Sequence, residues 1–240
     1  MKRNLLFGAV AVLAGSLVAA YAGPKDEVTS AAQKLGEKGN YSWKSTVDAG
    51  GGGSARFGGP TEGKTEKGGL TYLSMTRGDN TIEAVKKGEK GAIKTQDGWQ
   101  SLAEATAGGS DQPSPGRFVA RMLQTFKAPA AQAEDLVTKM KDVKKDGDAY
   151  AGDLTEEGAK ALMTFGGRGG GANAPEISGA KGSVKFWIKA GVLSKFEFNV
   201  QGKVTFNNNE REVNRTTTVE IKDVGTTKVT VPDEAAKKLS

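Results

Sequence analysis

Apolar and polar residues alternate most clearly in the last third of the chain. The alternation runs over 184–189, stops at a turn at 190–191 and resumes over 195–200. Because successive side chains of a strand point to opposite faces, this pattern predicts a hairpin with one apolar face and one solvated face. Further strands, rich in threonine and valine, are predicted at 204–206, 216–221 and 226–231.

The first half of the chain predicts one helix followed by short strands. Residues 24–38 have a proline at the start, acidic residues in the first turn and apolar residues along one side, as expected of a helix. The period then changes, and we expect an antiparallel meander. Its strands are predicted at 41–47, 70–76, 81–86 and 91–95, separated by turn sequences rich in glycine and aspartate.

Apolar residues recur at helical spacing in the middle of the chain, in two stripes separated by a proline. They predict a helical insertion at 117–142, with one apolar face on each helix. An extended segment at 148–154 precedes a helix at 156–164, for which Thr155 is the predicted N-cap. A short terminal helix is predicted after Pro232. Together these elements predict an α+β fold, a large antiparallel sheet with helices on one face.

Two glycine-rich segments, 50–59 and 166–179, are predicted to be loops. Residues 58–65, at the end of the first, match the phosphate-loop pattern G-x-x-x-x-G-K-[ST] letter for letter. A phosphate-binding loop needs a buried strand before it and a helix after it, and neither flank fits. We therefore expect no nucleotide site here.

The N-terminus has a basic start, an uncharged apolar run over 5–22 and an A-x-A exit at 20–22. This predicts a secretory signal peptide at 1–22, cleaved near Ala22, and a single mature domain at 23–240 in an extracytoplasmic compartment, periplasmic or secreted. The alternative is a retained membrane anchor, because the run is at the lower limit of a spanning helix.

The 240 residues contain neither histidine nor cysteine. This excludes Ser-His-Asp and Cys-His nucleophiles, thiol redox chemistry, and zinc, haem or iron–sulfur sites that use those ligands. Carboxylate chemistry stays open, but no acidic residue stands among aromatics as in a sugar cleft. We therefore predict that the protein is not an enzyme and has no catalytic residue, no cofactor and no metal site.

The formal net charge is +6, with 34 lysines and arginines mixed among 28 acidic residues. Lysine and arginine form no long cluster, which argues against nucleic acid as a partner. Weak attraction to anionic headgroups, and with it a transient membrane contact, stays open.

Two segments resemble a known family. Residues 223–232 (DVGTTKVTVP) form a glycine-containing turn, a Thr/Val-rich stretch and a proline, and residues 91–99 (GAIKTQDGW) form a strand, an Asp-Gly turn and an aromatic. They resemble the LolA/LolB-like lipoprotein-carrier superfamily, which includes mycobacterial lipid-carrier lipoproteins and related periplasmic sensors. The resemblance implies a strongly curved, LolA-like antiparallel sheet, an unclosed barrel, whose concave apolar face is covered by helices and can hold acyl chains.

Two hypotheses follow for the function. In the first, an apolar cavity between the sheet and the helices binds a lipid, an acyl chain or an acylated protein such as a lipoprotein. In the second, the core is solid and the chain is an extracytoplasmic sensor or protein-interaction module of the same fold. The oligomeric state is left open. The residues predicted to line the cavity are Phe118, Met122, Phe126, Leu136, Met140, Phe186, Ile188, Phe196 and Phe198.

Overall fold

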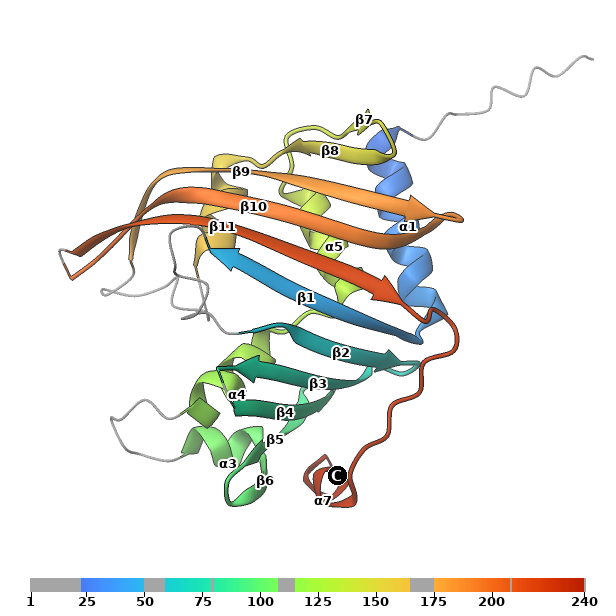
Figure 1. Ribbon diagram of the computed structural model, residues 1–240, viewed down its shortest axis with the longest axis vertical. Coiled ribbons are helices and arrows are strands. Elements are labelled where there is room, and N and C mark those ends of the chain that lie inside the picture. Colours follow the sequence, from blue (N-terminus) through green and yellow to red (C-terminus); the bar gives the residue numbers. More distant parts are fainter. Residues whose placement is uncertain are drawn as a thin grey trace, which may run out of the picture.

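The computed structural model describes residues 23–49, 59–78, 80–107, 115–164, 175–207 and 209–239. Within these ranges the main element is one antiparallel sheet of 11 strands, in the order β6-β5-β4-β3-β2-β1-β11-β10-β9-β8-β7 (Figure 1). In the described part of the chain β6 and β7 each pair with one neighbour, so the sheet is not closed. The strands are β1 (Tyr41–Ala49), β2 (Thr61–Glu66), β3 (Leu70–Arg77), β4 (Asn80–Lys87), β5 (Lys90–Thr95), β6 (Gly98–Ser101), β7 (Lys144–Asp146), β8 (Ala149–Asp153), β9 (Glu176–Lys189), β10 (Val192–Phe206) and β11 (Asn209–Lys222).

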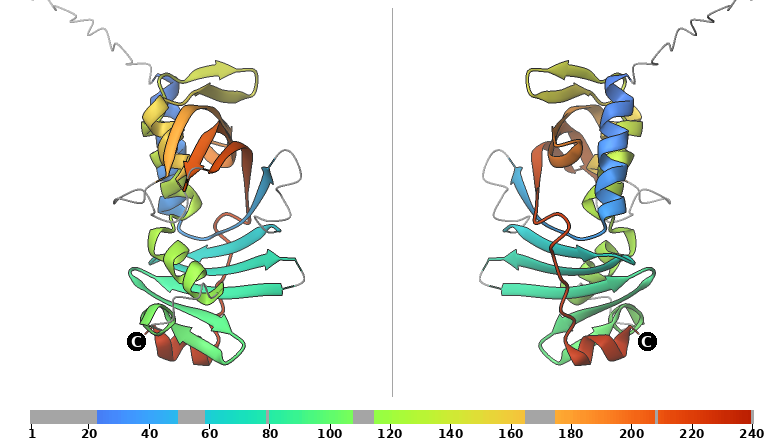
Figure 2. Two further views of the ribbon diagram at one scale, coloured as in Figure 1. Left: turned by 90° about the vertical axis from the view of Figure 1, so that its left-hand side faces the viewer. Right: turned by 90° about the vertical axis from the view of Figure 1, so that its right-hand side faces the viewer.

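Helices cover the concave face of the sheet. α1 packs on α5 and across β10, α6 packs on β9 and β10, and α4 packs on α3 and β5. Figure 2 shows the curvature of the sheet, with α1, α4 and α5 along the same side. The predicted fold class, α+β with a curved, unclosed antiparallel sheet covered on one face by helices, is confirmed. The helices are α1 (Pro24–Lys38), α3 (Leu102–Ala107), α4 (Pro115–Thr125), α5 (Pro129–Thr138), α6 (Glu156–Met163) and α7 (Asp233–Lys238).

The hairpin of β9 and β10 turns where the sequence predicts. Ala190 and Gly191 have φ angles of 51° and 74°, and a two-residue turn with positive φ at both positions matches the twist of the flanking strands. Phe186 then lies opposite Phe196, with ring centroids 6.3 Å apart. Both side chains are fully buried, so this hairpin forms the solid part of the core.

β1 joins the two halves of the sheet by pairing with β2 on one side and β11 on the other. β2 was not predicted, because its sequence TEGKTE is polar and has no strand pattern. It becomes a strand because both of its edges are paired, one with β1 and one with β3. Most of the phosphate-loop match therefore lies in a strand that turns directly into another strand, which is incompatible with a phosphate-binding loop.

Other predicted boundaries differ from the structure. The helical insertion predicted at 117–142 consists of α4 and α5, and the chain leaves the helix after Thr138, so that Met140 forms an isolated bridge with Leu154. The last residues of the predicted loop at 166–179 belong to β9. β6, α3 and β7 were not predicted.

The predicted strand at 226–231 is wrong. Both edges of β11 are already occupied, by β1 and β10, so the chain that follows has no edge to pair with. It runs instead to α7, which packs on the opposite face of the sheet, where Ala235 joins a second small apolar cluster with Val85 and Trp99.

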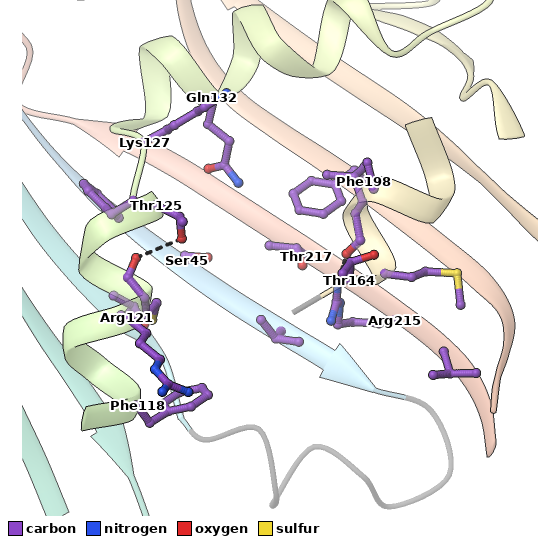
Figure 3. Close-up of a pocket in the computed structure, with 18 of the residues that line it drawn as sticks. Ser45, Phe118, Arg121, Thr125, Lys127, Gln132, Thr164, Phe198, Arg215 and Thr217 are labelled. Atoms are coloured by element: carbon purple, nitrogen blue, oxygen red, sulfur yellow. Dashed lines mark hydrogen bonds between the residues drawn. The ribbon is translucent and has the colours of Figure 1, made fainter. Parts of the chain in front are cut away.

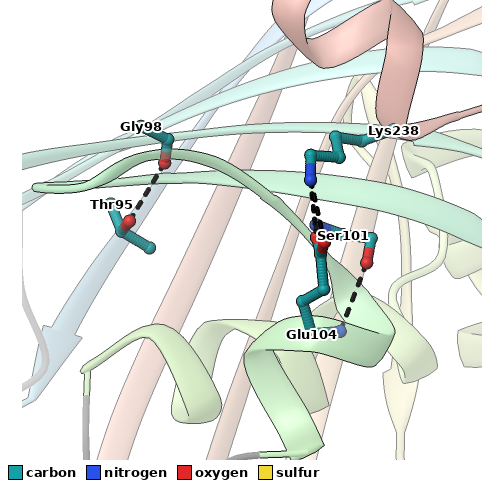
Figure 4. A network of polar contacts seen from close by, with 5 residues as sticks. All are labelled: Thr95, Gly98, Ser101, Glu104 and Lys238. Atoms are coloured by element: carbon teal, nitrogen blue, oxygen red, sulfur yellow. Dashed lines mark hydrogen bonds and ion pairs between the residues drawn. The ribbon is translucent and has the colours of Figure 1, made fainter.

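α7 is held to α3 by charge. Lys238 donates to Glu104 Oε1 and Oε2 at 2.8 and 3.0 Å (Figure 4). Glu104 also accepts from the backbone N–H of Ser101 at 2.7 Å, while the Ser101 hydroxyl accepts from the backbone N–H of Glu104 at 3.2 Å. This reciprocal pair is a capping box, so one carboxylate both begins α3 and anchors the C-terminal helix.

None of the helices in the described ranges is long and apolar enough to cross a membrane. The predicted signal peptide at 1–22 lies outside the described residues, as do residues 50–58 and 166–174 of the two predicted glycine-rich loops.

Candidate ligand-binding cavity

The helices cover the sheet unevenly and leave a hollow over its middle. A cavity of about 1240 Å³ lies between α4 and α5 on one side and α6 on the other. Its floor is formed by β1, β10 and β11 (Figure 3). The described residues that line it are Trp43, Ser45, Val47, Thr61, Leu73, Arg117, Phe118, Arg121, Met122, Thr125, Phe126, Lys127, Gln132, Asp135, Leu136, Ala161, Leu162, Met163, Thr164, Pro175, Phe198, Val204, Phe206, Asn207, Asn209, Arg211, Arg215 and Thr217.

The apolar stripe of α4 is divided between the cavity and the core. Phe118, Met122 and Phe126 follow one another at intervals of one helical turn and line the cavity. Val119 and Leu123, one position further along, are fully buried in the main core. α4 is therefore anchored by one part of its apolar face and presents the other part to the hollow.

An aromatic stack ties the end of α4 to the sheet. The rings of Phe126 and Trp43 are stacked, with centroids 5.9 Å apart and an angle of 19° between their planes. Trp43 extends over Gly63 in β2, where an added Cβ would lie 2.2 Å from the indole ring. The indole can occupy this position only because residue 63 is glycine.

Five of the nine predicted site residues line the cavity: Phe118, Met122, Phe126, Leu136 and Phe198. Of the other four, three lie elsewhere in the main core and one packs against it. Phe186 and Phe196 are fully buried, Met140 is 3% exposed, and Ile188 packs against the core from outside it. The apolar face of β10 is thus closely packed where α1 covers it, and it borders the cavity near α6.

The charged part of the cavity wall was not predicted from the sequence. Arg117 and Arg121 come from α4, Lys127 from the link between α4 and α5, and Arg211 and Arg215 from β11. A signal for the β11 pair is present in the sequence. Positions 211, 215, 217, 219 and 221 share one strand face, and the last two are buried apolar residues, so that strand alternation places both arginines on the inner face.

Arg215 is the most deeply placed of these cations. Arg215 is 6% exposed, and its guanidinium Nη2 donates to the carbonyl oxygen of Leu162 in α6 at 2.7 Å. Burial lowers the pKa of Arg215 to about 10, so the guanidinium is still charged at neutral pH. Figure 3 shows Arg215 beside Thr164 and Thr217, while Arg121 and Phe118 extend from α4 on the other side of β1.

One carboxylate, Asp135, is found among the described wall residues. It pairs with Lys127 at 2.9 Å and with Lys139 at 2.6 Å. Burial acts to raise the pKa of Asp135, but hydrogen bonds from Lys139 and Lys127 outweigh it and lower the pKa. The negative charge of this wall is therefore compensated within α5 and its N-terminal link.

Two aromatic side chains are exposed at the border of the cavity. Phe118 of α4 is 47% exposed and Phe206 at the end of β10 is 41% exposed, and both line the hollow. Both rings therefore add exposed apolar surface to the border of the hollow.

No protein-family model and no curated protein sequence matches this chain. Three similar solved structures are LprF from Mycobacterium bovis, the lipoprotein LppX from Mycobacterium tuberculosis and a LolA superfamily protein from Nitrosomonas europaea. For LprF the identity is 12% and the TM-score 0.44, with 88% of this chain and 97% of that one covered. For LppX the identity is 8% and the TM-score 0.44, with 87% of this chain and 98% of that one covered. For the LolA superfamily protein the identity is 10% and the TM-score 0.33, with 88% of this chain and 97% of that one covered.

Proposed function

We propose that this chain is an exported, non-enzymatic protein that binds a lipid, an acyl chain or an acylated protein in the cavity between its sheet and its helices. The observation that carries the proposal is the cavity of about 1240 Å³ and its aromatic and aliphatic wall. Pockets for ordinary small molecules have volumes of about 300–1,000 Å³, so this hollow suits a larger or longer ligand.

The wall has the properties that an acyl chain requires. Met122 and Met163 lie on opposite sides of the cavity, and methionine adapts its shape to flexible apolar ligands. Each methylene removed from water contributes roughly 0.8 kcal/mol, so burial of about ten methylenes supplies roughly 8 kcal/mol. That corresponds to about micromolar affinity before the cost of immobilising the chain.

The wall offers little to an enzyme. The chain has no histidine and no cysteine, and the carboxylate described in the wall, Asp135, is held by two lysines. General acid–base catalysis by a pair of carboxylates needs a second acid near the first, which this arrangement does not supply.

The binding proposal is tested with protein purified from its host. Native mass spectrometry followed by lipid extraction should show a bound species that is absent from delipidated protein. The delipidated protein should then bind an apolar fluorescent dye, such as Nile red, saturably and with one class of site. If neither a bound mass nor dye binding is found, the proposal fails and the protein-interaction module becomes the better hypothesis.

Export is a separate part of the proposal and rests on the pattern of residues 1–22. N-terminal sequencing of the extracytoplasmic fraction should begin at Gly23. A membrane-bound product that retains Met1 would show that the segment is an anchor.

A further inference from the structure

Arginine is distributed very unevenly over this protein. Arg117, Arg121, Arg211 and Arg215 all line the cavity, and the one other arginine in the described ranges is Arg77 of β3. Lysine, which is far more abundant in the chain, contributes a single described residue to the wall, Lys127. Of the five arginines in the described ranges, four therefore line the cavity.

The two cations differ in what they recognise. A guanidinium is planar and offers paired N–H donors that match the two oxygens of a carboxylate or phosphate, whereas an ammonium group acts as a hydrated point charge. On the rest of the surface lysines pair with acidic neighbours, such as Lys203 with Glu210 at 2.8 Å and Lys94 with Glu83 at 2.6 Å. Surface charge balance accounts for those lysines, whereas the four arginines share one location, the lining of the cavity.

The cavity arginines range from exposed to buried. Arg121 and Arg211 are exposed, Arg117 is partly buried and Arg215 is buried. They come from α4 in the wall and from β11 in the floor, and the stacked rings of Trp43 and Phe126 line the same hollow. Charges of one sign lining a cleft with low-dielectric walls concentrate ligands of the opposite sign.

We propose that the ligand is an anionic amphiphile, whose carboxylate or phosphate headgroup is bound by the cavity arginines while its acyl chains occupy the apolar part. This inference rests on the proposed function and names its ligand class. A neutral lipid would cover the charged arginine side chains without supplying an opposite charge, which is costly. A small hydrophilic anion would leave the aromatic and aliphatic wall without a partner.

Matched ligands test the inference on delipidated protein, with displacement of neutral Nile red as the readout. Hexadecanoate is compared with hexadecanol, and dipalmitoyl phosphatidic acid with dipalmitoylglycerol, so that each pair differs only in the headgroup. Because a hydrogen bond to a charged group is worth a factor of about ten or more, the anionic member of at least one pair should bind about tenfold more tightly. The pair with the larger ratio tells whether the natural headgroup is a carboxylate or a phosphate.

Variants identify the groups responsible. The double variant Arg121→Gln/Arg211→Gln changes two exposed side chains, so its urea midpoint should stay that of the wild type, while the preference for the anionic ligand falls about tenfold or more. Lys87→Gln, an exposed change outside the cavity, should leave the preference unchanged. Arg215→Lys keeps the buried charge but loses the planar fork, and should reduce the preference even where the protein stays folded.

The outcomes separate the two proposals. If the acid and the alcohol, and likewise the two glycerolipids, displace the dye equally and the double variant changes nothing, the anionic headgroup is refuted while lipid binding stands. If no ligand displaces the dye in the wild type, lipid binding itself is refuted and the headgroup inference falls with it.

Discussion

Two neighbouring residues of α4 allow a direct test of where the core ends and the cavity begins. Met122 lines the cavity and is partly exposed, whereas Leu123 is fully buried in the main core and does not line the cavity. Substitution of either residue by alanine removes the same number of heavy atoms from the same helix. Leucine, methionine and alanine are all good helix formers, so the change in helix propensity is small in both variants.

The expected costs differ because the surroundings differ. Leu123→Ala opens a void among close-packed side chains and should lower the free energy of unfolding by about 2–5 kcal/mol. The Met122 side chain already borders a hollow and is only partly removed from water on folding, so its truncation should cost about 1 kcal/mol or less. Ligand affinity should respond in the opposite order, because in the proposed binding mode Met122 contacts the bound chain and Leu123 does not. The loss of about two methylene contacts lowers the affinity of the Met122→Ala variant by about tenfold.

Both quantities can be measured on the same preparations. Urea unfolding followed by tryptophan fluorescence gives the midpoint and the slope, and an unchanged slope shows that the two states are comparable. Titration with Nile red gives the affinity of the folded protein. The reasoning is refuted if Met122→Ala destabilises the protein as much as Leu123→Ala while dye affinity is unchanged, because Met122 would then lie in a solid core.

Two further predictions concern the support of the cavity and the C-terminal helix. Gly63→Ala should displace the Trp43 indole, which would lie 2.2 Å from the new Cβ, and so reduce both stability and dye affinity. Gly36→Ala in α1 adds a Cβ whose nearest neighbour is Ala130 Cβ of α5 at an ordinary 3.7 Å, and should stabilise the protein by about 0.5–1 kcal/mol. Equal unfolding midpoints for the two variants would contradict the close approach of Trp43 to Gly63. The hydrogen bonds from Lys238 and Ser101 lower the pKa of Glu104 to about 2 from an ordinary value of 4.5. The stabilisation that ionised Glu104 gives to the contact between α3 and α7 is therefore complete above pH 4.5. It is lost as the pH falls through about 2. An NMR titration of the Glu104 carboxyl with a midpoint near its ordinary value would show that the contact is not formed.

Much of the fold can be predicted from local patterns of the sequence. The α1 helix begins at a proline and buries one stripe, Thr155 caps α6 by accepting from the backbone N–H of Gly158 at 2.9 Å, and the hairpin of β9 and β10 turns at 190–191. These features depend on the residues within one element or one turn. Sequence periodicity therefore predicts them, and the absence of histidine and cysteine limits the chemistry just as directly.

The pairing of strands that lie far apart in the sequence does not depend on local sequence patterns. β2 is a strand only because β1 and β3 flank it, and 226–231 is not a strand because β11 has no free edge. A polar segment between two partners gains its hydrogen bonds from them, while a segment with good strand composition gains none without an edge. Neither outcome can be read from the segment's own residues.

The cavity is the clearest case of a feature that tertiary structure alone decides. Phe196 and Phe198 are two positions apart on the same face of β10, and the alternation of the strand predicts correctly that both point inward. Both belong to the main core, but Phe196 is fully enclosed, whereas Phe198 also lines the hollow. Periodicity determines the direction of a side chain relative to its own strand, but whether that direction ends in packed atoms or in open space depends on which helices lie across it.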